Sequence, residues 1–72
     1  MKFISIEDKE TTDIAIVNTD QITSIIQRNE TVFITLACGK TLQTKFTEVG
    51  PAIDYIQRAP SFSYNYIREM VL

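Results

Sequence analysis

Apolar and polar residues alternate along the first two thirds of the chain, as they do in β-strands. In the segment 2–7, Ile4 and Ile6 fall on one side, because successive side chains of a strand point to opposite faces. Similar short segments, separated by polar breaks, follow at 13–17, 22–28, 31–37 and 41–46. Short strands joined by short turns predict an antiparallel β-meander of about five strands over residues 1–46.

The breaks between these segments carry residues that favour turns. Asn18-Thr19-Asp20 ends the second segment and Asn29 ends the third. The short side chains of Asn and Asp bond their own backbone and so stabilise turns. Gly39 lies between the fourth and fifth segments, where its freedom to adopt a positive φ suits a tight hairpin.

The period of the pattern changes after Thr47. Apolar residues now recur every three or four positions, which predicts an amphipathic helix over 48–59. The residues in this stripe are Val49, Ala52, Ile53, Ile56 and Ala59. We expect Thr47 to cap the helix, Glu48 to favour its positive end, and Pro60 to end it. A helix packed on the meander makes a single α+β domain of residues 1–72.

The C-terminal tail, residues 61–72, allows two interpretations. Phe62, Tyr64 and Tyr66 alternate with small polar residues, which favours a sixth strand. Ile67, Met70 and Val71 follow helical spacing instead. A strand that leads into a helical turn satisfies both patterns.

The predicted sheet has more apolar surface than one helix can cover. One face is expected to carry Ile4, Ile6, Ile14, Ile16, Val32, Ile34 and Leu36, and the other Phe3, Ala15, Val17 and Phe33. A helix is only about 10 Å wide. The second face must therefore be covered by the tail, by curling of the sheet into a barrel, or by another chain.

We expect the partner to be a second copy of the chain, which would make a homo-oligomer. The aromatic tail is rich in residue types favoured at interfaces. The predicted partner-binding residues are Phe62, Tyr64, Tyr66 and Ile67. The alternative is that the tail folds back on its own sheet.

The amino-acid composition argues against most kinds of enzyme activity. The chain has nine acidic and seven basic residues, a formal net charge of -2, no histidine and one cysteine. Histidine is the usual general base near neutral pH and the usual activator of Ser and Cys nucleophiles. A lone thiol cannot complete a tetrahedral metal site. We therefore expect no enzyme, no catalytic residues, no metal and no cofactor.

Two chemical candidates remain after this exclusion. Lys40 could activate the thiol of Cys38, although a small residue at a strand end is the simpler interpretation. The carboxylate pairs, Glu7 with Asp8 and Glu48 with Asp54, are expected to be solvated.

The N-terminal residues form no apolar signal segment, and a single cysteine fits a reducing compartment. These features predict a cytoplasmic location and no membrane partner.

The acidic balance disfavours nucleic acid as a partner. A single-stranded nucleic-acid binder is kept as an alternative, because rings on a small sheet can stack bases while cations contact phosphates. Arg28, Lys40 and Lys45 are the bases that folding could bring together.

The stretch 16–58 resembles the FlbD-like family of small bacterial motility proteins. The matching elements read Val17-Asn18, Ile22-Thr23-Ser24-Ile25, Ile34-Thr35-Leu36-Ala37-Cys38-Gly39-Lys40 and the helix from Val49 to Ile56. The resemblance implies strands and hairpins closed by a helix. The charged loop 7–10 and the aromatic tail depart from the family. The same pattern is similar to half of a LytTR-type DNA-binding domain and to small phage and mobile-element proteins.

The sequence thus predicts a non-enzymatic binding or regulatory module, from a bacterium or a phage, that self-associates and acts through protein–protein contacts. Two alternatives stay open. One is a phage or mobile-element inhibitor that binds a host protein or a nucleotide. The other is the single-stranded nucleic-acid binder.

Overall fold

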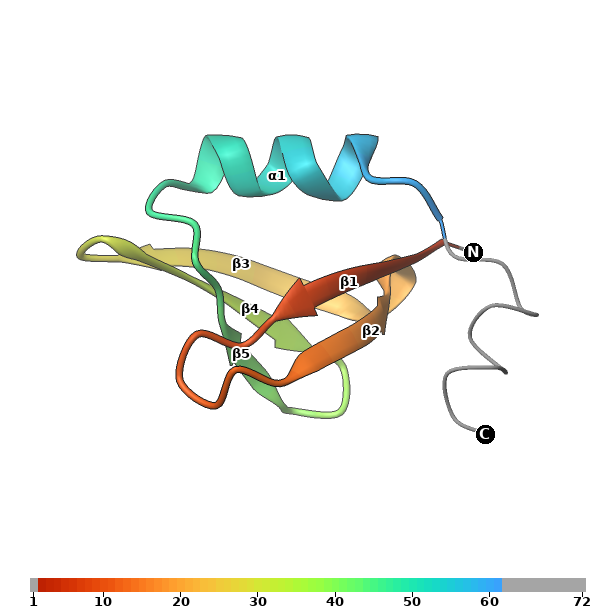
Figure 1. Ribbon diagram of the computed structural model, residues 1–72, viewed down its shortest axis with the longest axis horizontal. Coiled ribbons are helices and arrows are strands. Elements are labelled where there is room, and N and C mark those ends of the chain that lie inside the picture. Colours follow the sequence, from red (N-terminus) through yellow and green to blue (C-terminus); the bar gives the residue numbers. More distant parts are fainter. Residues whose placement is uncertain (1, 62–72) are drawn as a thin grey trace.

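The computed structural model describes residues 2–61, which form five strands and one helix (Figure 1). The elements are β1 Phe3–Glu7, β2 Ile14–Asn18, a 3-10 turn Thr19–Gln21, β3 Ile22–Arg28, β4 Thr31–Leu36, β5 Thr41–Gln43 and α1 Val49–Arg58. All paired strands are antiparallel. The predicted α+β fold is confirmed, with the strands divided between a β1–β2 hairpin and a β3–β4–β5 sheet.

The turns form where the sequence predicts them. Asn18 accepts the backbone N–H of Asp20 at 3.0 Å and begins the 3-10 turn between the two sheets. Asn29 has a φ of 56° in the β3–β4 hairpin, and Gly39 has a φ of 93° in the β4–β5 hairpin. Both values lie in the left-handed region, which Gly and Asn enter at least cost.

The face that β2 presents to the core is the reverse of the one expected. Val17 and Ala15 pair with Ile4 and Ile6, so all four side chains point the same way. Val17 is buried, whereas Ile14 is 66% exposed. Because β2 is apolar at almost every position, its own pattern does not decide which face is inside. The register of the hairpin decides it.

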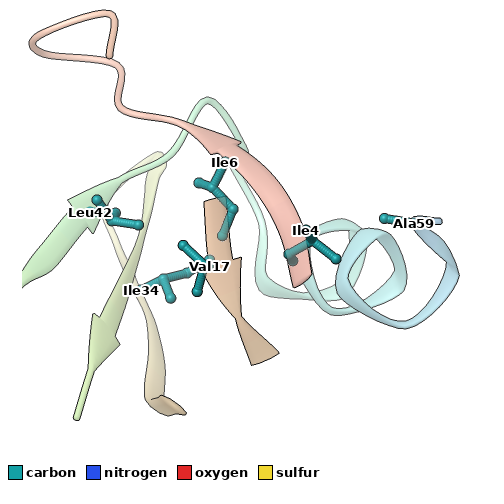
Figure 2. Close-up of a cluster of buried hydrophobic side chains, with 6 residues drawn as sticks. All are labelled: Ile4, Ile6, Val17, Ile34, Leu42 and Ala59. Carbon is teal, nitrogen blue, oxygen red and sulfur yellow. The ribbon is translucent and has the colours of Figure 1, made fainter. Parts of the chain in front are cut away.

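The hydrophobic core lies between the two sheets rather than under one flat sheet. Figure 2 shows Ile34 and Leu42, from the β3–β4–β5 sheet, pointing toward Ile6 and Val17 of the hairpin. Ile4 lies at the other side of this cluster, next to Ala59 beyond the end of α1. The sheets therefore curl around a shared core, which is one of the three ways to cover a second face.

The helix spans nearly the predicted residues, but its N-terminus is capped differently. Glu48, not Thr47, is the N-cap, and its side chain makes no capping hydrogen bond. The N–H of Val49 instead donates to Oε1 of Gln27 at 3.1 Å. A distant strand thus supplies an acceptor that local sequence cannot reveal. Ala59 is the C-cap, as its position before Pro60 predicts.

The side of α1 that faces the sheets also differs in one residue. Ala52 and Ala59 are buried as expected, but Ile53 is 38% exposed. Tyr55 packs against the core in its place. In Figure 1, α1 runs along one side of the molecule, above β3 and β1.

β5 ends at Gln43, three residues earlier than expected. The N–H of Thr44 donates to Val32 O, but the N–H of Val32 donates to Phe46 O rather than to Thr44 O. A regular antiparallel pair exchanges both bonds. The chain is therefore irregular over 44–46 although it stays beside β4.

The tail, predicted as a strand or a helical turn over 61–72, lies outside the described residues except for Ser61. No helix within residues 2–61 combines the length and apolar character needed to cross a bilayer.

Candidate functional site

A small pocket lies where β1, the segment after β5, and α1 meet. It has a volume of about 210 Å³ and is lined by Ser5, Ile6, Glu7, Thr44, Lys45, Phe46 and Tyr55. A backbone hydrogen bond from Lys9 N–H to Gln43 O, 2.7 Å long, joins the two chain segments nearby. The pocket therefore forms at the seam between the two sheets.

The polar groups of the pocket are engaged with each other. Lys45 Nζ lies 2.5 Å from Glu7 Oε2, and both side chains are partly exposed. The hydroxyl of Tyr55 donates to Ser5 O at 2.6 Å, and its ring lies 5.6 Å from the ring of Phe46. An exposed ion pair of this kind contributes little stability. The Tyr55 hydroxyl joins α1 to β1, and the aromatic pair joins α1 to the segment after β5.

The capacity of this pocket is limited. Sites for drug-sized ligands typically measure roughly 300–1,000 Å³, which exceeds the 210 Å³ found here. The lining residues offer one carboxylate and one ammonium group, which pair with each other, and three hydroxyls, of which those of Ser5 and Tyr55 lie 3.3 Å apart. The pocket can hold a small molecule or one side chain of a partner.

A second candidate surface is the outer edge of β2. Two hydrogen bonds flank the β1–β2 ladder, from Thr19 N–H to Lys2 O and from Asp8 N–H to Asp13 O. Bonded and non-bonded pairs alternate in an antiparallel ladder. These flanking bonds therefore place the amides of Ile14, Ile16 and Asn18 on the edge away from β1.

The chemical candidates predicted from the sequence are not assembled into a site. Cys38 is exposed in a turn. Glu7 pairs with Lys45 rather than with Asp8, and Asp54 pairs with Arg58 at 2.7 Å. Within residues 2–61, no group of three or more His, Cys, Asp or Glu side chains gathers to hold a metal ion.

Asp8 has a structural role in the β1–β2 loop. Its Oδ1 accepts the N–H groups of Glu10 at 2.9 Å and Thr11 at 3.2 Å. The bond from Thr11, helped by the one from Glu10, holds the pKa of this carboxyl below its ordinary value of 3.8. The loop uses the carboxylate as an acceptor for its own backbone.

Of the three basic residues expected to cluster, Arg28 and Lys40 lie at opposite ends of β4. Arg28 lies at the end of β3, 5.8 Å from the centre of the Phe33 ring. Lys40 lies at the opposite end of β4, in the β4–β5 hairpin, and Lys45 pairs with Glu7. The described residues therefore do not combine these three cations into one patch.

The predicted partner-binding residues Phe62, Tyr64, Tyr66 and Ile67 lie outside the described residues. The chain enters the tail at Ser61, whose Oγ accepts the N–H of Phe3 at 3.3 Å. The tail therefore begins beside the first residue of β1.

Sequence reasoning missed both surfaces described here. The pocket depends on Tyr55 facing β1, and the helical pattern assigns the inward position to Ile53 instead. The open edge of β2 depends on which strands pair. The one available signal was the run of four apolar residues from Ile14 to Val17, which is longer than a one-sided strand needs.

Comparison with known protein families, characterised proteins and solved structures finds no match for this chain, so the resemblance to the FlbD-like family stays a prediction.

Proposed function

We propose that this chain is a non-enzymatic binding module that self-associates and acts through protein–protein contacts. The observation that carries the proposal is the outer edge of β2, where three backbone amide positions and the 66% exposed Ile14 meet no other strand within residues 2–61. Exposed strand edges pair readily with strands of other chains.

The size of the pocket favours a macromolecular partner over a nucleotide. At about 210 Å³ it suits one side chain better than a base, a sugar and a phosphate together. The dispersed cations and the net charge of -2 favour a protein over a nucleic acid.

The tail supplies the second part of the proposed contact. It contributes three aromatic residues and an isoleucine over a short stretch: Phe62, Tyr64, Tyr66 and Ile67. Aromatic side chains bury a large area at a low cost in conformational entropy. Because the tail starts beside Phe3, it begins on the same hairpin that carries the open edge.

Sedimentation velocity of the full chain tests this proposal. We expect an oligomer at about 50 µM, a concentration in the range of ordinary specific affinities. A quadruple variant, with Phe62, Tyr64, Tyr66 and Ile67 replaced by Ser, is expected to sediment as a monomer.

The matched control is Ile53→Ser, which removes exposed apolar surface from α1 and should leave the oligomer intact. A wild-type chain that stays monomeric at this concentration would overturn the proposal. If the quadruple variant still forms the oligomer, the tail does not contribute to the contact.

A further inference from the structure

Another part of the chain contacts the outer backbone edges of β1 and β5, whereas the outer edge of β3 is reached only at a side chain. On β1, Phe3 N–H donates to the side chain of Ser61, and Ser5 O accepts the hydroxyl of Tyr55. On β5, Gln43 O accepts Lys9 N–H. On β3, the side chain of Gln27 accepts from the first residue of α1, and the strand carries a register shift between Ile22 and Ser24 and a charge at Arg28. Within residues 2–61, the outer edge of β2 receives no such contact.

The β2 edge also lacks the features that normally prevent edge-to-edge pairing. Such edges usually carry a lysine, a proline, a bulge or an inward-pointing charge. β2 reads Ile-Ala-Ile-Val-Asn, is regularly paired with β1, and has no charged residue. Ile14 and Ile16 stand on its outer face, and Ile14 is largely exposed.

We infer that a second copy of this chain pairs with β2 along this edge, antiparallel, with a two-fold axis at Ile16. This inference rests on the proposed self-association and specifies its geometry. The result is a continuous four-stranded sheet that joins the hairpins of the two copies, an isologous contact of the kind most soluble dimers use.

The register follows from the free amides. With the axis at Ile16, Ile16 faces the partner's Ile16, and Ile14 faces the partner's Asn18. The outward-facing amides of Ile14, Ile16 and Asn18 then all belong to hydrogen-bonded pairs. A shift by two residues in either direction leaves one of them opposite a residue outside the strand, Thr12 or Asp20.

The charges that flank β2 agree with this register. Asp13 lies opposite the partner's Thr19, and Asp20 lies opposite the partner's Thr12, so no two acids face each other. Like charges directly opposite in a sheet are destabilising. The strand itself is neutral, so the chain's overall charge of -2 adds little repulsion at the contact.

The chain that follows Ser61 can complete the interface. A contact between two five-residue strands is smaller than the roughly 1,200 Å² that stable interfaces bury. Eleven residues follow Ser61 and can span up to about 35 Å from their start beside Phe3. The joined outer face, with Phe3, Ile14 and Ile16 from each copy, lies within that reach.

Amide hydrogen exchange of the full-length chain, measured by NMR at several concentrations, tests the inference. We expect the amides of Ile14, Ile16 and Asn18 to exchange about tenfold more slowly once the concentration of free chain is about ten times the dissociation constant of the dimer. The amides of Ile25 and Gln27, on the outer edge of β3, serve as the internal control and should not respond.

The variant Ile16→Lys places two ammonium groups at the axis and should abolish both the oligomer and the added protection. Its control, Ile26→Lys, adds the same charge to the outer face of the other sheet, where Ile26 is 47% exposed. It should leave both unchanged.

The outcomes separate the two proposals. An oligomer that persists without added protection at Ile14, Ile16 and Asn18 would overturn the β2 pairing and leave the self-association standing. Protection of these amides in a chain that sediments as a monomer would also overturn the pairing, because it would mean that the chain covers its own edge. A monomer at every concentration would overturn both.

Discussion

Thr44 is a buried polar residue in the core, with 1% of its surface exposed. Its hydroxyl donates to Val32 O at 2.8 Å and accepts the N–H of Phe46 at 3.2 Å. A buried hydroxyl is tolerated only when it is hydrogen-bonded. Here it also closes the irregular turn of chain that replaces the last residues of the expected fifth strand.

The substitution Thr44→Val tests this role at nearly constant volume. Val32 O keeps the bond from Thr44 N–H, but the N–H of Phe46 loses its acceptor. We expect a loss of about 1 kcal/mol in the free energy of unfolding, measured by urea denaturation. Thr47→Val, at an exposed position, should change it by less than about 0.5 kcal/mol. Equal stability of the Thr44→Val variant and the wild type would argue against a structural role for the hydroxyl.

The carboxyl of Asp8 makes the stability of the β1–β2 loop depend on pH. Its pKa is lowered in the folded state, chiefly by the bond from Thr11 N–H, so the stabilisation is complete above the unfolded pKa. It is lost as the pH falls through the lower, folded pKa. An NMR titration should therefore give Asp8 a pKa below 3.8.

Denaturation of the Asp8→Asn variant gives a second measure of the same effect. The stability advantage of the wild type over the variant should shrink between about pH 5 and pH 2. Asp13→Asn, in the same loop, is the control, because Asp13 does not accept the N–H groups of Glu10 and Thr11. A measured pKa at or above 3.8 for Asp8 would contradict this assignment.

At the scale of the elements, the local sequence pattern was sufficient to predict which segments form strands and which forms the helix. Alternation, turn residues and the change of period before α1 predict every strand and the helix within a few residues of their ends. What they do not predict depends on distant partners. The face of β2 follows from its pairing with β1, and the cap of α1 comes from Gln27 on β3.

The C-terminal end of α1 depends on the opposite end of the chain. Lys2 Nζ donates to Ile56 O at 2.9 Å and to Gln57 O at 2.8 Å, two carbonyls of the last turn. A cation at this position satisfies free carbonyls and interacts favourably with the helix dipole. The residue before β1 thus holds the helix against the hairpin.

Replacing Lys2 with Met keeps the aliphatic stem and removes the donor. We expect the free energy of unfolding to fall by about 0.5–1 kcal/mol, and the amides of the last turn of α1 to exchange faster with solvent. Lys40→Met removes the same charge from the β4–β5 hairpin and should leave those amides unchanged. Unchanged exchange in the Lys2→Met variant would show that α1 does not need this cap.

At the scale of the molecule, the candidate surfaces were less predictable than the fold. Surplus apolar surface can be counted from the sequence, but its location depends on how the sheets curl. Curling buries Val17, partly buries Ala15 and leaves Ile14 66% exposed, so the most exposed large apolar side chain of the described residues lies on the β1–β2 hairpin. The pocket likewise forms at a seam that exists only when β1 and the chain after β5 meet.

Thermal unfolding should report the association directly. A chain of 72 residues buries a thin core, so a second copy that binds only the folded state adds a large share of its stability. We expect the wild-type melting temperature to rise by about 5–10 °C over a hundredfold increase in concentration around the dissociation constant. The quadruple tail variant should melt at one temperature throughout, because a monomer gains nothing from concentration, whereas Ile53→Ser should keep the wild-type slope. A wild-type melting temperature that stays constant over this range would mean that the core between the two sheets holds the fold unaided.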